Sequence, residues 1–587
     1  MPEEQNEPEN QPEVVEPAQP ESTEIAKPEK AKDPSASKLD RLKLWYTSNK
    51  KISIPLTVLL FIIILAAVPF TRYAIAGTVV KKDMSVKVLD DTSATPVSGA
   101  QVSTGSVNAI TNASGVATLK HISVGPHDLT VTKKYYKDKK TSLTLPVMQQ
   151  KSIPTVQIEA TGRQVQVTVT DSIDKSAVAG VSITVAGTNA KTDSGGVATM
   201  VVPTGANEQK ATLTQSGYND TEVTLKISSD KILNNEVKMT PAGKVYFLSK
   251  LSGKIDVVKT NLDGTERKTV LAGTGKEEDQ NTVLLASRDW KYLALLSRRA
   301  GSNPTLYLID TSNDSSSVID EGNAAFTLVG WVGQNFVYTV ERSNVGLWQA
   351  DRHAIKSFNA PSKKIVTLDQ TTATGTSNYN YVGESLGTIY GYDDQIYYIK
   401  NWGSSGDVGT KQATFNSIKT DGTAKKTIKS FGLSSGSTSS YISVEAKVEK
   451  PDKTHFYFYD GAKDNFYIYS DGQFKTDTTI KTSSDFFTAS YPTFLQSPSD
   501  KNTFWSEPRD GKNTLFIGDD DGNNEKQITT LSDYNTFGWY TDNYLLVSKN
   551  SSELYAMSKD GKNAIKISDY HKPAVTFQGY GGGYGGL

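Results

Sequence analysis

The pentapeptide at 432–436 (GLSSG) matches the G-x-S-x-G spacing of a serine-nucleophile elbow. In that elbow the serine lies on a sharp turn between a strand and a helix, so the motif requires both elements around it. Here the pentapeptide lies in a run of serine, threonine and glycine, which is typical of a loop. We therefore interpret it as a linker between strands and assign no nucleophile to Ser434.

Two further stretches resemble ion-binding or phosphate-binding loops without completing the pattern. The acidic run at 519–522 (DDDG) has Ile517 where a D-x-D-x-D-G calcium loop has its first carboxylate, so we predict a hairpin turn there. The stretch at 273–276 (GTGK) is followed by Glu277, not by the Ser or Thr of a phosphate-binding loop. The sequence predicts no catalytic, cofactor-binding or metal-binding residue, and no cofactor.

Composition narrows the chemistry further. The 587 residues include no cysteine, which excludes disulfides, cysteine-ligated zinc, iron–sulfur clusters and thiol nucleophiles. Five histidines are present, and those at 353, 455 and 571 lie far apart with no H-E-x-x-H motif. The formal net charge of −1 does not favour a nucleic-acid partner. Trp348, Trp402, Trp505 and the many tyrosines would stack on sugar rings if exposed, although aromatic sheet cores account for most of them.

The amino-terminal segment combines an acidic tail with an apolar run. Residues 1–37 are rich in proline and acidic side chains and predict a disordered tail. A basic juxtamembrane segment follows at 38–51, and 52–70 contains nineteen residues without a charge, long enough to span about 30 Å of hydrocarbon as a helix. We expect one transmembrane helix at 52–70, with the amino terminus in the cytoplasm and the rest outside the cell membrane.

Two other interpretations of the apolar run remain open. It would be a core helix if the protein were soluble, but the rest of the chain has the pattern of strands. It would be a signal peptide if cleavage followed Ala74-Ile75-Ala76, an A-x-A triplet, although the 51 preceding residues and the length of the run argue against this. Cleavage would release the same outer domains.

An internal repeat covers the next part of the chain. Gly99, Thr111 and Gly115 recur as Gly180, Thr192 and Gly196, each 81 positions later. Short runs between these residues alternate apolar and polar side chains, which predicts antiparallel strands with one buried face. The two copies, at 84–160 and 161–240, each have the length of a sandwich of about seven strands.

The repeat motifs resemble a known family. The order Pro-Val-x-Gly-Ala-x-Val at 96–102, Thr-Asn-x-x-Gly at 111–115 and Gly-x-His-x-Leu-x-Val at 125–131 is similar to carboxypeptidase regulatory-like domains, with overlap toward PEGA-type modules. The second copy departs from it, with Ala177 in place of the proline. The resemblance implies two transthyretin-like β-sandwiches that act as spacers without catalysis. His121 and His127 are then expected on the sandwich surface.

A second repeat begins after Pro241 and carries Asp-Gly pairs. These pairs predict hairpin turns because glycine readily adopts positive φ, and their spacings of about 40–50 residues or multiples of 50 are typical of four-stranded propeller blades. The Asp-Gly pairs stand at 263–264, 421–422, 471–472, 521–522 and 560–561.

These units resemble the TolB-type propeller repeat, which is shared in style with dipeptidyl-peptidase-like proteins. The best match is the segment 554–563, whereas Trp290 stands where the family has a glycine. The resemblance implies a β-propeller at 241–580. We count seven blades, which begin near 243, 280, 325, 378, 440, 491 and 534, and six or eight blades are the alternatives. We expect residues 574–580 to supply the missing innermost strand of the first blade, and a glycine-rich tail at 581–587.

We therefore predict a mainly β protein that is not an enzyme and is anchored in the membrane through 52–70. Its two sandwiches would form a stalk, and its propeller would bind an envelope protein or a cell-surface glycan, with no nucleic-acid partner. The alternatives are a propeller-based envelope hydrolase or lyase and a purely structural spacer.

Overall fold

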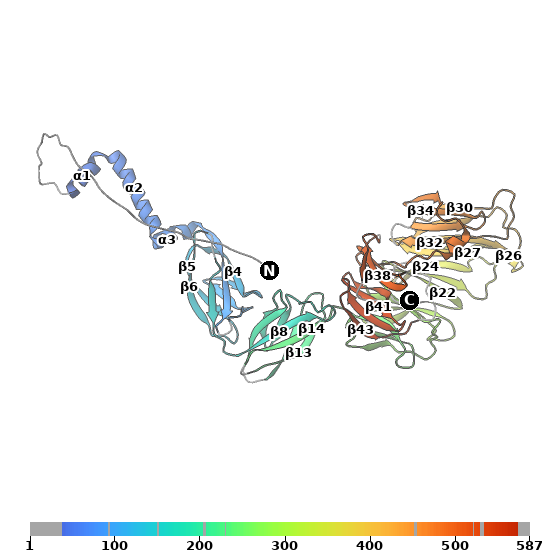
Figure 1. Cartoon of the computed structure of the whole chain (residues 1–587), viewed down its shortest axis with the longest axis horizontal. Helices are drawn as coiled ribbons and strands as arrows, with labels where there is room; N and C mark the ends of the chain where they lie inside the picture. Colours follow the sequence, from blue (N-terminus) through green and yellow to red (C-terminus); the bar gives the residue numbers. More distant parts are fainter. Residues whose placement is uncertain are drawn as a thin grey trace, which may run out of the picture. The chain divides into compact units, whose positions relative to one another are not determined.

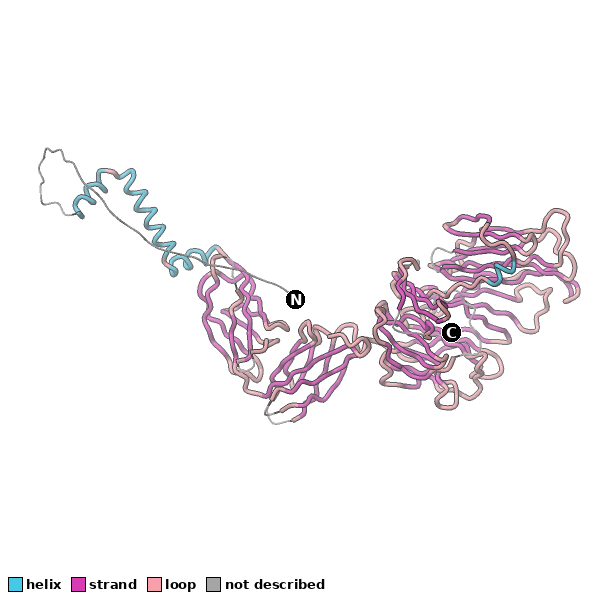
Figure 2. Tube along the Cα trace, viewed as in Figure 1, coloured by secondary structure: helices cyan, strands magenta, loops and turns pink. Residues whose placement is uncertain are grey.

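The computed structural model of the chain is mainly β, with 54% of residues in strands and 8% in helices. It describes residues 38–91, 94–148, 152–203, 207–228, 231–450, 455–520, 522–528 and 533–572. The predicted acidic tail at 1–37, the closing strand at 574–580 and the tail at 581–587 lie outside the described residues. Helices gather before the first strand, and α4 (Ser483–Thr488) is a short helix within the β region (Figure 2).

The apolar run does not form one helix as predicted. Helix α1 (Lys38–Ser48) precedes α2 (Lys50–Ala67), and α3 (Pro69–Val79) follows a break at Val68 (Figure 1). The predicted span at 52–70 is thus wrong at its end, because Pro69 has no N–H to continue α2 and disfavours helical backbone at the residue before it. No single described helix is long and apolar enough to cross a membrane; only a pair passes together, Leu42–Ser48 with Lys50–Ile64, bent by 112°.

The repeat at 84–240 contains two pairs of sheets. In the first copy the sheets have the orders β4-β1-β7 and β3-β2-β5-β6, and in the second β11-β8-β14 and β10-β9-β12-β13. The first-copy strands are β1 (Lys81–Asp90), β2 (Gln101–Thr104), β3 (Val107–Ile110), β4 (Val116–Ser123), β5 (Gly125–Thr132), β6 (Lys139–Leu145) and β7 (Thr155–Ile158). The second-copy strands are β8 (Arg163–Asp171), β9 (Ser182–Val185), β10 (Thr188–Lys191), β11 (Val197–Val202), β12 (Glu208–Thr214), β13 (Thr221–Lys226) and β14 (Leu233–Met239).

The offset of 81 residues recurs in the hydrogen bonds. The buried hydroxyl of Thr111 donates to the carbonyl of Val97 at 2.6 Å, and that of Thr192 donates to Val178 at 2.7 Å. In the second copy, buried residues of both sheets form one hydrophobic cluster that includes Val167. The sequence repeat therefore marks equivalent turns and equivalent buried faces.

Seven consecutive antiparallel sheets follow over 245–569, in the residues described. The first three contain β15 (Val245–Ser249), β16 (Asp256–Thr260) and β17 (Lys268–Leu271); β18 (Val283–Ala286), β19 (Tyr292–Ser297), β20 (Thr305–Asp310) and β21 (Ser315–Glu321); and β22 (Ala324–Val332), β23 (Asn335–Arg342), β24 (His353–Asn359) and β25 (Lys364–Gln370). The fourth contains β26 (Ala373–Ser377), β27 (Asn380–Tyr392), β28 (Gln395–Ser404), β29 (Ala413–Lys419), β30 (Lys426–Phe431) and β31 (Tyr441–Ile442).

The last three sheets each have four strands. They contain β32 (Val444–Lys450), β33 (His455–Asp460), β34 (Asn465–Ser470) and β35 (Gln473–Thr476); β36 (Leu495–Gln496), β37 (Asn502–Arg509), β38 (Lys512–Asp519) and β39 (Lys526–Ile528); and β40 (Asn535–Thr541), β41 (Tyr544–Lys549), β42 (Glu553–Ser558) and β43 (Ala564–Asp569).

The predicted Asp-Gly hairpins are confirmed where the whole pair is described. Each joins two consecutive strands of its sheet, and Gly264, Gly422, Gly472 and Gly561 all have φ between 72° and 86°. Positive φ is cheap for glycine alone, which explains the residue at these turns. Asp521 lies outside the described residues, and its neighbour Gly522 has φ 74°.

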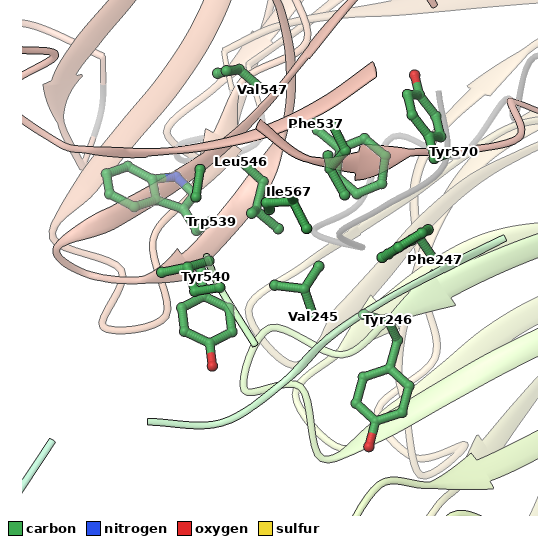
Figure 3. Packing of buried hydrophobic residues seen from close by; sticks show 14 of the residues in the cluster. Val245, Tyr246, Phe247, Phe537, Trp539, Tyr540, Leu546, Val547, Ile567 and Tyr570 are labelled. Carbon is green, nitrogen blue, oxygen red and sulfur yellow. The ribbon is translucent and has the colours of Figure 1, made fainter. Parts of the chain in front are cut away.

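The first and last of the seven sheets share one core (Figure 3). Val245 and Phe247 of β15 lie in the same hydrophobic cluster as Trp539 and Leu546 of the last sheet. The two ends of a chain segment about 325 residues long therefore pack together, and the seven sheets form a closed arrangement. Among the described residues, no strand of the first sheet pairs with a strand of the last.

The contacts of Trp290 explain why a tryptophan stands where the family pattern has a glycine. Its φ is 58°, as a glycine turn would have, and this backbone strain costs about 1–3 kcal/mol in a bulky residue. The buried indole N–H of Trp290 donates to the carbonyl of Trp539 at 2.9 Å. The first sheet has only three described strands, and the indole reaches past it to the last sheet, so the strain is offset by a closing contact.

Candidate functional site

The fourth of the seven sheets extends further than the others at one end. Its β27–β28 turn and its β29–β30 turn lie at one end, so the loops after β28 and β30 lie at the opposite end. There β26 adds to the edge of β27, and β31 pairs with the last residues of β28. Figure 1 labels β26 at the edge of this sheet. We call this end of the sheet, with residues 371–381, 402–412, 432–441 and the neighbouring loop 344–350, the aromatic rim.

Five aromatic side chains lie on the aromatic rim. Tyr379 is 92% exposed and Tyr441 is 65% exposed, while Trp348, Tyr381 and Trp402 are partly exposed. Tyr441 pairs with Gly403 on the neighbouring strand, next to Trp402. Tyr379 and Tyr441 leave most of their surface open to solvent, unlike the aromatic residues of the sheet cores.

Glycines beneath the rings bring the rim segments close together. A Cβ at Gly375 would lie 2.9 Å from the Cβ of Trp348, and one at Gly403 would lie 3.9 Å from the hydroxyl of Tyr381. A Cβ at Gly383 would lie 3.0 Å from the carbonyl oxygen of Leu347. Larger residues at Gly375 and Gly383 would push the loop away, so these glycines help to position the aromatic rings.

Hydrogen bonds connect the rim loops to one another. The Ser404 N–H donates to Ser440 at 2.8 Å, and Val408 N–H donates to Ser439 at 2.9 Å. The Leu347 N–H donates to the side chain of Asn378 at 2.9 Å. The rim is therefore an organised surface and not a set of independent loops.

A buried ion network lies below the rim. Lys400 Nζ contacts Glu384 Oε2 at 2.6 Å and Asp369 Oδ2 at 3.6 Å, and all three side chains are 12% exposed or less. Glu384 also accepts from the N–H of Thr372 at 2.7 Å, just before β26. Buried charges such as these are costly without a partner, so Lys400 and Glu384 hold each other in place. Through the bond to Thr372, the Lys400–Glu384 pair also fixes the start of the β26–β27 hairpin.

The hydroxyl of Tyr398 completes this network by donating to Asp369 at 2.6 Å. Burial raises the pKa of Asp369, but hydrogen bonds from Lys425 and Tyr398 outweigh this and hold it below the usual value. Burial and the same carboxylate raise the pKa of Tyr398. Asp369 is therefore ionised and Tyr398 protonated at neutral pH, which is a structural arrangement that presents no acid or base to solvent.

A second cluster pairs a histidine with an acid. His571 Nε2 lies 3.3 Å from Asp279 Oδ1, and Lys250 Nζ lies 2.9 Å from the same oxygen. Burial lowers the pKa of His571, although Asp279 opposes this. The backbone N–H of His571 donates to Leu248 of β15 at 2.9 Å, which places the pair where the first and last sheets meet. An imidazole that stays neutral beside a carboxylate has the composition of a general base.

The other residues that the sequence singled out divide between the aromatic rim, a sheet core and a loop. Trp505 is 2% exposed and belongs to a core, whereas Trp348 and Trp402 share the rim. Residues 432–436 form a loop between β30 and β31, so the strand-to-helix turn of a nucleophile elbow is not formed there. Among the described residues no group of three or more His, Cys, Asp or Glu is placed to hold a metal ion.

The four remaining histidines lie at other positions, and His455 begins β33 with its ring centroid 5.3 Å from that of Tyr457. His127 Nε2 contacts the carbonyl of Ser123 at 2.6 Å, and His121 is exposed at a positive φ of 57°. His353 begins β24, and burial lowers its pKa. The sequence offered the tyrosines as a class without singling out Tyr379 and Tyr441, and it gave no indication of the His571–Asp279 pair. The serine-rich and threonine-rich segments of the rim were a signal that the sequence contained. The His571–Asp279 pair had no such signal, because the two residues are far apart in the chain.

Solved structures of β-propellers resemble this chain. A TolB from Acinetobacter baumannii covers 54% of this chain and 77% of its own length at 13% identity, with a TM-score of 0.26. The propeller domain of the trilobed protease from Pyrococcus furiosus covers 58% and 93% at 14% identity, with a TM-score of 0.32. An oligogalacturonate lyase in complex with manganese covers 57% and 87% at 8% identity, with a TM-score of 0.31. At such identities the likeness concerns the fold alone.

The comparisons correct one prediction and leave another untested. Most of the neighbours are peptidases and one is a lyase, which contradicts the prediction that the chain is not an enzyme. The chain spans only about half the length of an acylaminoacyl peptidase among them, at 50% of that chain. No protein-family model and no curated protein matches the sequence. The resemblance of 84–240 to carboxypeptidase regulatory-like domains stays a prediction.

Proposed function

We propose that the chain is a membrane-anchored protein whose propeller lies outside the cytoplasm and binds a component of the cell envelope through the aromatic rim. The observation that carries this proposal is the rim itself, where exposed rings such as Tyr379 and Tyr441 stand on a hydrogen-bonded frame. Aromatic side chains that are partly exposed on a fixed frame are typical of binding surfaces.

The exposure of α2 supports the anchor. Its apolar side chains, including Ile52 at 61%, Leu56 at 55% and Phe61 at 61%, are open to the surroundings, which is costly in water and favourable in lipid. The 18 residues rise about 27 Å, close to the thickness of a hydrocarbon core. We propose that α2 spans the bilayer, with the basic segment at 38–51 on the cytoplasmic side.

Helix α1 fits the membrane surface in this arrangement. Its apolar residues Leu42 and Trp45 are 66% and 46% exposed, and Lys43 is exposed as well. A short helix with leucine, tryptophan and lysine at the start of a span is suited to the headgroup region. The bend between α1 and α2 would then mark the inner face of the membrane.

We further propose the domain arrangement expected from the sequence. The paired sheets at 84–160 and 161–240 would be two transthyretin-like sandwiches in a stalk, and the seven sheets would be seven blades of one propeller at 241–580. The contact between the second sandwich and the propeller supports a stalk, because the hydroxyl of Tyr544 donates to the buried Asp171 at 2.7 Å and Ile173 lies in the propeller core.

A second candidate function is acid–base chemistry at the seam of the first and last sheets. The observation that favours it is the His571–Asp279 pair, since a neutral imidazole held by a carboxylate is the usual general base of hydrolytic sites. Under this candidate the rim would bind the substrate and the chain would be an envelope hydrolase or lyase. Loss of a measured hydrolysis or elimination activity in His571→Gln, with retained binding, would support it.

Crosslinking in intact cells tests the main proposal. A photo-crosslinking amino acid replaces Tyr379 on the rim in one variant and Asp421, at the opposite end of the same sheet, in a control variant. We expect a discrete envelope adduct from position 379 and none from 421. Equal adduct patterns from both positions, or no adduct from 379, would contradict the proposed binding role.

A further inference from the structure

The chemistry of the aromatic rim goes beyond binding in general, and this inference rests on the proposed function. We propose that the rim binds an uncharged carbohydrate chain. Such a ligand presents apolar C–H faces on each sugar ring and hydroxyl groups around the edge. The rim combines exposed aromatic faces with a dense array of hydroxyl and amide groups.

The open ring faces provide the first half of this match. Tyr379 and Tyr441 expose 92% and 65% of their surface, and Trp348, Tyr381 and Trp402 are partly exposed beside them. An aromatic face is negative at its centre and attracts the weakly positive C–H groups of a sugar ring. Several rings on one surface would contact successive sugars of a chain.

The side chains around the rings provide the second half. The segments 371–380, 403–412 and 432–441 contain only two charged residues, Asp407 and Lys411. Most of the others are threonine, serine, asparagine or glycine. Lys411 lies over the ring of Trp402, at 4.9 Å from its centroid, so it covers one face of that ring. With one acidic and one basic residue in these segments, the rim has little attraction for a polyanion, and an uncharged ligand fits it better.

The small share of large aliphatic side chains on the rim argues against a protein partner, since only Val345, Leu347 and Leu433 among them are partly exposed. Protein interfaces place large apolar residues and arginine around their aromatic anchors. Here the exposed neighbours of Tyr379 are Asn378, Asn380 and Thr376, which offer hydrogen bonds and little apolar area. The rim frame also costs little to order, because backbone hydrogen bonds and the buried Lys400–Glu384 pair already hold it.

Titration calorimetry on the full chain in lipid nanodiscs tests this inference. The probes are two uncharged oligosaccharides, cellohexaose and chitohexaose, and one anionic oligosaccharide, hexagalacturonate. We expect measurable binding of at least one uncharged probe and no tighter binding of the anionic one. Because no ion pair forms, the affinity should change less than about twofold between 50 and 500 mM salt.

Matched variants distinguish the rim from other aromatic surfaces. The double variant Tyr379→Ala and Tyr441→Ala should weaken binding by at least about tenfold, because two ring contacts are lost. Phe487→Ala removes an aromatic side chain that is 56% exposed on helix α4, between the fifth and sixth sheets, and it should leave the affinity within about twofold.

Three outcomes would overturn the inference: no binding of either uncharged probe, preference for hexagalacturonate, or unchanged affinity in the double variant. A protein adduct from position 379 in cells, combined with no binding of uncharged sugars, would reject the carbohydrate while leaving the broader binding role intact. Loss of both the adduct and the sugar binding would reject both proposals.

Discussion

Substitution of Trp539 by phenylalanine tests how the seven sheets are held together. Trp539 is 0% exposed, and its indole N–H donates to the carbonyl of Leu495 in the preceding sheet at 2.7 Å. Loss of the donor removes one hydrogen bond to that buried carbonyl, at about 0.5–1.5 kcal/mol. The smaller ring also removes about two buried carbons, which adds about 1.5 kcal/mol. We expect Trp539→Phe to lower the free energy of unfolding by about 2–3 kcal/mol.

Differential scanning calorimetry of the full chain measures this effect on the transition that contains the propeller. At about 2–4 °C for each kcal/mol in a domain of 150–250 residues, the midpoint should fall by roughly 4–12 °C. Trp348→Phe is the matched control, because that side chain is partly exposed in a loop, and it should change the midpoint by less than about 2 °C. Equal shifts in the two variants would refute the role assigned to the buried indole.

Three further predictions follow from the turns, the ion network and the stalk. Gly264→Ala should lower the midpoint of thermal unfolding more than Gly436→Ala does. Both glycines have positive φ, but only a Cβ at Gly264 collides with a carbonyl oxygen of the last described strand. Equal shifts in the two variants would contradict this. The carboxylate of Asp369 has a lowered pKa, so it contributes stability above the unfolded pKa of about 4 that is lost as the pH falls through the folded one. Urea unfolding between pH 2 and 7 should therefore show a weaker pH dependence in Asp369→Asn, and an unchanged profile would reject this. Tyr544→Phe should increase amide hydrogen exchange around Asp171 and leave exchange in the rim unchanged. Unchanged exchange around Asp171 would count against the contact between the second sandwich and the propeller.

The sequence predicted the local structure best where one residue type has one physical role. Gly264 and Gly561 marked hairpin turns because positive φ selects glycine, and the offset of 81 residues located equivalent hydrogen bonds of Thr111 and Thr192. The break in the apolar run was also visible in principle. Pro69 argues against a helix that continues through it. The prediction nevertheless ran to residue 70, because it relied on the absence of charge from 52 to 70.

Contacts between distant segments could not be predicted in the same way. Trp290 looked like a defect in a glycine position, and only the closed arrangement shows that its indole reaches Trp539. The His571–Asp279 pair likewise depends on the chain end returning to the first sheet. The rim depends on the insertion of β26 into the fourth sheet, which periodic spacing cannot reveal.

The most direct test of the account is the location of the propeller, and the chain suits it because it contains no cysteine. Thr376→Cys on the rim and Ser48→Cys before α2 are each labelled in intact cells with a membrane-impermeant maleimide. The account predicts rapid labelling at 376 and labelling at 48 only after the cells are opened. Labelling at 376 only in opened cells would contradict it.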